Sequence, residues 1–275
     1  MSIRTDLAIE LEKNTEDNLF KTEKIGETEV IFTTLNDNNP YGKVKGKYIT
    51  IKVGKIDLLT DFCEVEKAIK ISLESLITKG WKSILIVGLG NREITSDCIG
   101  PFTAEKILAT RHIMGEFCEK IGLSGLKSVS VITPSVLGKT GIESYEIIKA
   151  VTTKIKPDAV ILIDALCASN TQNIFSVIQL TDSGISPGSG VKNTRKEISQ
   201  KTLGIPCIAI GVPTVVEANV IAKELSGKEE TKPLDLILTP KDTDLLSHRI
   251  SEILAKSLNL FLQPDTDREV LLSLV

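Results

Sequence analysis

The stretch Ser83-Ile-Leu-Ile-Val-Gly-Leu-Gly-Asn91 decides the fold class of this chain. A continuous apolar run that ends in glycines is typical of a parallel strand buried on both faces of a sheet. Further strands are predicted at 128–133, 158–164, 174–180, 205–211 and 234–238, and helices at 65–78, 101–115, 142–155, 214–226 and 241–262. Strands that alternate with helices predict an α/β fold, with a mostly parallel, twisted sheet covered by helices on both faces.

The region before this stretch predicts a small N-terminal β element. Strand-like segments at 29–34 and 47–53 flank the turn sequence Asn36-Asp-Asn-Asn-Pro40, which favours pairing of the two segments. No internal repeat or low-complexity tract interrupts the sequence. We therefore expect one α/β domain over residues 1–275.

The composition argues against several classes of protein. The net charge is −3, so no surplus of positive charge is available for direct binding to nucleic acid. No apolar run approaches the roughly 18 residues that a membrane span needs. The five cysteines are scattered without a Cys-x-x-Cys pair, which favours free thiols in a reducing cytoplasm over disulfides or a zinc site.

Two carboxylates follow predicted strands, at the edge of the sheet where ligands bind in α/β folds. Asp97 comes after the strand at 83–88, and Asp164 ends the strand at 158–164. Two nearby carboxylates can divide acid and base work over a water molecule, because repulsion raises one of the two pKa values. The plainer alternatives are a helix cap for Asp97 and an acceptor of loop N–H groups for Asp164.

Other catalytic patterns are incomplete. The Gly88-Leu-Gly90 turn lacks the third glycine of a dinucleotide site, and the chain has neither a phosphate loop nor a nucleophile elbow. His112 and His248 fall in predicted helix interiors, which leaves a His-dependent triad or a metal site short of ligands. Cys98 and Cys167 follow the two aspartates but have no evident base.

The sequence Pro187-Gly-Ser-Gly190 has three interpretations: a backbone site for an anion, a mobile loop over the active site, or a plain turn. Basic residues follow it at Lys192, Arg195 and Lys196. Such a patch is either a solvated face or a contact for an acidic substrate.

Several blocks, taken together and in order, resemble the spore germination protease family. They are Gly88-Leu-Gly-Asn91, Asp97-x-x-Gly-Pro101, Leu137-Gly-Lys-Thr-Gly-Ile-Glu143, Ile163-Asp-Ala-Leu166, Thr181-Asp-Ser-Gly-Ile-x-Pro-Gly-Ser-Gly-Val191, Leu203-Gly-Ile-Pro206, Ile210-Gly-Val-Pro-Thr-Val-Val216 and Thr239-Pro-Lys-Asp242. The resemblance implies a fold similar to the hydrogenase-maturation peptidases. It also implies two aspartates that activate water, which correspond to Asp97 and Asp164.

The same resemblance implies an endopeptidase of endospore-forming bacteria that degrades small acid-soluble spore proteins when the spore germinates. Such enzymes are homotetramers in the cytoplasm of the spore core, and we expect no cofactor and no metal. They are made as zymogens that lose a short N-terminal segment after an acidic residue followed by an apolar residue and alanine. Asp6-Leu7-Ala8 fits this form, so we expect self-cleavage between Asp6 and Leu7, with residues 1–6 as the propeptide.

Backbone N–H groups near the aspartates are candidates for holding an oxyanion or substrate. They belong to Gly88, Gly90 and Asn91, and to Gly188, Ser189 and Gly190. Two other functions stay open on the residues alone. One is a metal-assisted, maturation-type peptidase with the aspartates as ligands, and the other is a non-catalytic α/β module that binds phosphate.

Overall fold

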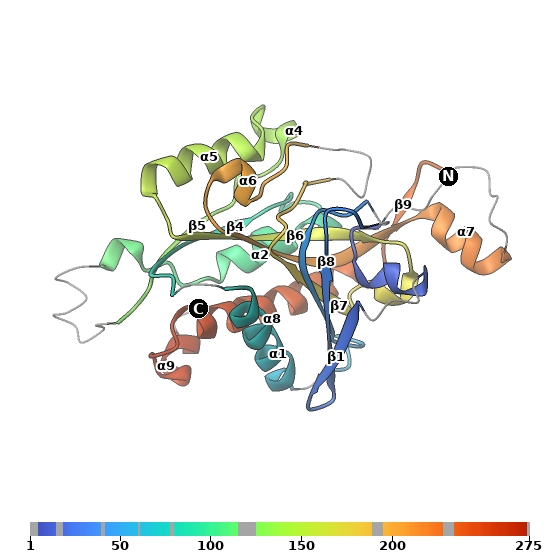
Figure 1. Cartoon of the computed structure of the whole chain (residues 1–275), viewed down its shortest axis with the longest axis horizontal. Helices are drawn as coiled ribbons and strands as arrows, with labels where there is room; N and C mark the ends of the chain where they lie inside the picture. Colours follow the sequence, from blue (N-terminus) through green and yellow to red (C-terminus); the bar gives the residue numbers. More distant parts are fainter. Residues whose placement is uncertain are drawn as a thin grey trace.

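The computed structural model describes residues 5–14, 19–39, 42–59, 61–77, 80–114, 125–188, 195–227 and 234–273. Within them the chain forms a nine-stranded sheet with helices on both faces (Figure 1). The strands are β1 (Phe20–Ile25), β2 (Thr28–Leu35), β3 (Gly46–Lys52), β4 (Ser83–Gly88), β5 (Ser128–Ile132), β6 (Ala159–Ala168), β7 (Val177–Thr181), β8 (Cys207–Glu217) and β9 (Ile237–Leu238). The α-helices are α1 (Cys63–Leu76), α2 (Ile99–Glu105), α4 (Leu137–Thr140), α5 (Ser144–Ile155), α6 (Gln200–Leu203), α7 (Ala218–Ser226), α8 (Thr243–Leu262) and α9 (Arg268–Ser273). Short 3₁₀ helices are η1 (Ile9–Asn14), η2 (Thr95–Asp97), η3 (Arg111–Ile113) and η4 (Thr171–Asn173).

The sheet is parallel on one side and antiparallel on the other. Its strand order is β1-β2-β3-β7-β8-β6-β4-β5, with β9 paired to the end of β8. Strands β5, β4, β6 and β8 pair in parallel, as the alternation of strands and helices predicts. Strands β1, β2, β3 and β7 pair antiparallel and continue the same sheet. The α/β architecture is confirmed, and the parallel part is limited to four strands.

The apolar run in β4 is continuous because its two faces belong to two different cores. Ile84 and Ile86 point to the core beneath α1 and α8, whereas Leu85 and Val87 point to the core beneath α5 and α6. All four side chains are buried. A strand covered on both faces has no polar side to show, which is why its sequence does not alternate.

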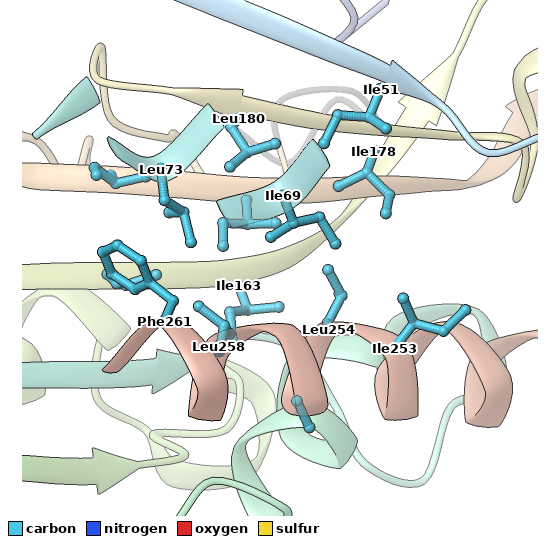
Figure 2. Close-up of a cluster of buried hydrophobic side chains, with 14 of the residues drawn as sticks. Ile51, Ile69, Leu73, Ile163, Ile178, Leu180, Ile253, Leu254, Leu258 and Phe261 are labelled. Carbon is cyan, nitrogen blue, oxygen red and sulfur yellow. The ribbon is translucent and has the colours of Figure 1, made fainter. Parts of the chain in front are cut away.

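The larger core lies between the sheet and α8, where a row of apolar side chains faces the strands (Figure 2). Ile253, Leu254 and Leu258 on α8 are fully buried and face Ile163 of β6. Ile69 on α1 packs in the same cluster. Both helices carry their buried residues at helical spacing, so burial of one apolar face anchors them to the sheet.

The predicted N-terminal β element is present, and it is larger than expected. The segments at 29–34 and 47–53 correspond to β2 and β3, which pair antiparallel. A further strand, β1, pairs with β2, although its side chains are mostly exposed and give no alternating signal. The element is not separate, because β3 also pairs with β7 and so joins the main sheet.

Two predicted boundaries are wrong for a tertiary reason. The helix expected at 101–115 ends at Glu105, where the buried side chain of Asn259 on α8 bonds both Lys106 O (2.8 Å) and Leu108 N (2.9 Å). Strand β8 continues to Glu217, beyond the expected helix start at 214, because it pairs there with the extension of β6. A distant partner captures the backbone in both places.

Helix α2 approaches the sheet backbone to backbone, and glycines allow it to do so. A Cβ on Gly100 would lie 2.2 Å from Leu89 O and 2.5 Å from Ile163 O. A Cβ on Gly88 would lie 2.3 Å from Gly100 O. The start of α2 therefore rests directly on the end of β4 and on the middle of β6.

We expect Gly100→Ala to lower the free energy of unfolding by about 3 kcal/mol, because the added methyl group meets backbone atoms that cannot rotate away. Gly138→Ala on α4 is the matched control, since its Cβ would meet nothing within 4 Å. Alanine in place of an exposed helical glycine should be neutral or slightly stabilising. Urea unfolding followed by circular dichroism measures both, and equal midpoints would contradict the role of Gly100.

Candidate active site

Asp97 and Asp164 line the same cavity. Its volume is about 310 Å³. Asp97 ends η2, just before α2, and Asp164 lies within β6. Besides these carboxylates, the cavity is lined by Asp6, Gly90, Gly188, Arg195 and Thr214, among others. Side chains that are far apart in sequence thus meet where the sequence analysis expects them.

The Asp97 carboxylate is fixed by the turn that follows β4. The N–H of Asn91 donates a hydrogen bond to Asp97 Oδ2 at 2.8 Å. Gly90 adopts a φ of +109°, and a Cβ there would lie 2.2 Å from Asp97 O. The glycine therefore lets the turn close over Asp97.

Two hydroxyl groups from other elements fasten η2 to the rest of the fold. Thr214 of β8 donates to Ser96 O at 2.6 Å, and Ser247 of α8 donates to Thr95 O at 2.8 Å. Sequence reasoning did not assign Thr214 or Ser247 to the site. The residues next to Thr214 and Ser247 in the sequence do not indicate these contacts, because each contact joins residues more than a hundred positions apart.

Asp164 lies inside β6 and not at its end. The strand continues four residues further to Ala168, and Asp164 is opposite Gly211 of β8. Its side chain is only 5% exposed, and Asp164 Oδ1 accepts a hydrogen bond from Ala165 N at 3.0 Å. The predicted strand end at 164 is therefore corrected, whereas the position of the carboxylate at the cavity is as expected.

The cavity raises the pKa of both carboxyl groups. Burial raises the pKa of Asp97 to about 6, partly opposed by the bond from Asn91 N–H and by the charge of Arg195. Burial raises the pKa of Asp164 well above its usual value, and the charges of Asp97 and Asp6 raise it further. Both carboxyl groups therefore hold a proton more readily than an exposed aspartate does, and the negative charge of Asp97 adds to this effect at Asp164.

The predicted oxyanion residues have different positions. Gly90 and Gly188 line the cavity, whereas Gly88 is packed against Gly100. The Asn91 N–H donates to Asp97, and the Leu89 N–H donates to Ile163 O. This turn therefore positions Asp97 in the structure. Ser189 and Gly190 lie outside the described residues.

The histidines do not line this cavity, whereas Cys167 lines it and Cys98 directly follows Asp97. His248 stacks on Phe102 with ring centroids 4.4 Å apart, and His112 lies in η3 and not in the interior of a helix. Burial raises the pKa of the Cys98 thiol, and it raises that of Cys167 to about 12. Neither thiol is a ready nucleophile at neutral pH.

The segment that contains Asp6 and Leu7 is docked beside the cavity. Asp6 N donates to Cys167 O at 3.0 Å, and Cys167 N donates to Asp6 Oδ2 at 2.9 Å. Leu7 is fully buried in a cluster with Leu166 and Val216. The form of this segment in the sequence predicts a processing site, and the structure adds its partners Cys167, Leu166 and Val216.

Two searches of the described part of the chain bear on ligands and membranes. No group of three or more His, Cys, Asp and Glu side chains there has the arrangement of a metal site. None of the helices described is long and apolar enough to cross a bilayer.

Comparison with known proteins gives consistent relatives. A family model described as germination protease matches residues 4–226. The chain is 36% identical to the germination protease of Clostridium acetobutylicum over 96% of both chains. It is 38% identical to that of Clostridium tetani over 98% of both chains, and 40% identical to that of Bacillus cytotoxicus over 81% of this chain and 65% of the relative.

Among solved structures, a [NiFe] hydrogenase maturation protease, HycI from Thermococcus kodakarensis, matches 68% of this chain and 98% of its own, with a TM-score of 0.39 and 18% identity. The sequence relatives span nearly the whole chain, and the family model covers most of it. This chain therefore belongs to the germination protease family and is a peptidase with a role in spore germination.

Proposed function

We propose that this peptidase hydrolyses its substrate with Asp97 and Asp164 as an acid–base pair acting on a water molecule. The observation that carries the proposal is the meeting of the two carboxyl groups at one cavity, in environments that raise the pKa of both. Pairs of carboxyl groups with separated pKa values perform acid and base steps in other hydrolases.

The proposed reaction takes Asp97 as the ionised group and Asp164 as the protonated group, because the charge of Asp97 raises the pKa of Asp164. Ionised Asp97 accepts a proton from water as the water oxygen attacks the carbonyl carbon of the scissile peptide bond. Protonated Asp164 donates its proton to the leaving nitrogen, and the C–N bond breaks. The guanidinium of Arg195 also lines the cavity, where its charge favours the oxyanion that forms during attack. Amides of the turn at Gly188 are further candidates for this role.

The proposed substrates are small acid-soluble spore proteins, degraded in the cytoplasm of the spore core at germination. The active form is a homotetramer of one α/β domain per chain, without cofactor or direct contact with nucleic acid. The chain is made as a zymogen that cuts itself between Asp6 and Leu7. The position of Asp6 on the wall of the same cavity as Asp97 and Asp164 supports self-cleavage at this bond.

Asp97→Asn and Asp164→Asn should each lower kcat on a purified small acid-soluble spore protein by at least about a thousandfold, because one half of the acid–base pair is lost. Mass spectrometry of the fragments measures the rate. Exhaustive chelation of the wild-type enzyme should leave its rate unchanged. Near-normal turnover by either variant would contradict the proposal, and loss of activity on chelation would point to metal-assisted chemistry.

The same variants make a prediction about stability. The folded pKa of Asp97, about 6, lies above its ordinary value of 3.8, so ionisation opposes folding as pH rises through this interval. Asp97→Asn removes that cost and should raise Tm at pH 8, with the gain shrinking as pH falls toward 4. Differential scanning calorimetry at several pH values tests this, and a gain that does not depend on pH would contradict the shifted pKa.

The pH dependence of kcat/KM should follow both carboxyl groups. The rate should rise with pH through an apparent pKa near 6, as Asp97 loses its proton. It should fall again at higher pH, where Asp164 loses the proton that it donates. Initial rates on a peptide substrate between pH 4 and 10 measure the profile, and a rate that stays flat across pH 5 to 7 would contradict Asp97 as the base.

N-terminal sequencing of the active enzyme should find Leu7 as the first residue. The Asp164→Asn variant should keep residues 1–6, because self-cleavage uses the same pair. An active wild-type enzyme with an unchanged start would rule out this processing step.

A further inference from the structure

The segment from Asp6 to Glu10 binds to the rest of the chain as a peptide ligand would, through contacts to its backbone and to its side chains. Its long-range hydrogen bonds are made by β6, β7 and the loop after β6, all more than 150 residues away in sequence. The segment runs from the cavity with the two aspartates, which Asp6 lines, into a larger groove of about 810 Å³, which Ile9 and Glu10 line.

The buried side chain of Gln179 on β7 forms two hydrogen bonds with the backbone of the segment. Gln179 Nε2 donates to Asp6 O at 3.1 Å, and Gln179 Oε1 accepts from Ala8 N at 2.6 Å. The two contacts lie on either side of Leu7, like those of a neighbouring β-strand. Both hydrogen bonds are made to backbone atoms, so they do not depend on which side chains the peptide carries.

The first three side chains of the segment each contact a different set of residues. The Asp6 carboxylate accepts the N–H of Cys167 at 2.9 Å. Leu7 fills an apolar pocket that includes Leu166, Val177 and Val216. Ala8 is 1% exposed against Leu35 and Tyr48, so this position has room only for a small side chain.

The fourth position after Asp6 has a site of its own. Glu10 Oε2 accepts two hydrogen bonds from Ser169, from its N–H and from its hydroxyl group, both at 2.7 Å. Glu10 Oε1 accepts a third from Asn173 Nδ2 at 2.8 Å. Three hydrogen-bond donors around one side chain form a site suited to a carboxylate. An apolar side chain at this position would leave all three donors unpaired. We call Ser169 and Asn173 the carboxylate subsite.

We propose that this groove is the substrate-binding groove, and that the carboxylate subsite selects substrates with an acidic residue four positions after the residue whose peptide bond is cut. Gln179 aligns the peptide so that this bond lies at Asp97 and Asp164. The inference rests on the proposed function, because it takes the bond after Asp6 as the one that is cut.

The proposal also explains how the uncut chain inhibits itself. While the segment is intact, it occupies the groove that a substrate needs. Cleavage after Asp6 removes the contacts that Asp6 makes with Cys167 and Gln179. The remaining residues, beginning with Leu7, are then held by fewer bonds, and a substrate competes with them for the groove.

A peptide that copies residues 1–14 and a second peptide with Glu10→Gln test the subsite. Processed wild-type enzyme should cleave the first peptide with a kcat/KM about 10- to 100-fold higher, mainly through KM. Asn173→Ala and Ser169→Ala should slow cleavage of the Glu peptide and leave that of the Gln peptide nearly unchanged. Gln172→Ala, in the same turn but without a contact to Glu10, is the matched control and should keep the wild-type preference.

This comparison separates recognition from a structural effect, because a general loss of folding would slow both peptides equally. If wild-type enzyme cleaves both peptides at the same rate after Asp6, the carboxylate subsite is overturned while the proposed function stands.

If wild-type enzyme cleaves neither peptide, the proposed function fails. Peptide binding then tests whether the groove recognises a glutamate at this position. The affinities of both peptides, labelled with a dye, are then measured by fluorescence anisotropy on the Asp164→Asn variant. The variant's own segment competes equally with both, so the ratio of affinities is unaffected. A preference of 10-fold or more for the Glu peptide supports the groove, and equal affinities overturn it.

Discussion

The close approach of α2 to the sheet is the constraint on which the site depends. Gly100 rests on the carbonyl groups of Leu89 and Ile163, and Gly88 in turn leaves room for Gly100. Because no side chain separates the helix from the strands, Asp97 at the start of α2 comes down to the level of Asp164 on β6. A larger residue at either glycine would lift the helix and separate the two carboxyl groups, even though neither glycine takes part in the chemistry.

Placing two carboxyl groups in one small cavity makes ionisation of each group less favourable. Burial disfavours ionisation of both, and ionised Asp97 makes it still harder for Asp164 to lose its proton. The Asn91 N–H stabilises the charge on Asp97, so the negative charge settles there. The raised pKa values mean that ionisation of these groups opposes folding, and shifted carboxyl groups of this kind are typical of functional sites.

The extension of β6 and β8 beyond the rest of the parallel sheet joins the cavity lined by Asp97 and Asp164 to the binding position of the N-terminal segment. Residues after Asp164 continue as a strand, paired to β8 across an irregularity at Leu166/Cys167. This extension presents the backbone of Cys167 and Ser169 to the N-terminal segment, while Gln179 reaches the same segment from β7. Asp164, Cys167 and Gln179 thus lie on one continuous piece of sheet, which fixes the spacing between the cavity and the N-terminal segment.

The sequence by itself determined the α/β class, the parallel strands, the pairing of the segments at 29–34 and 47–53, and the two aspartates at one edge of the sheet. These follow from local patterns: doubly buried strands read as apolar runs, and parallel strands place their carboxyl ends together. Only the tertiary structure decided the early end of α2, the length of β6 and β8, the place of β1 and the docking of Asp6 to Glu10. Each of these depends on partners far away in the sequence, such as Asn259 for α2 and Gln179 for the N-terminal segment, and a pairing over such a distance leaves no periodic signal along the chain.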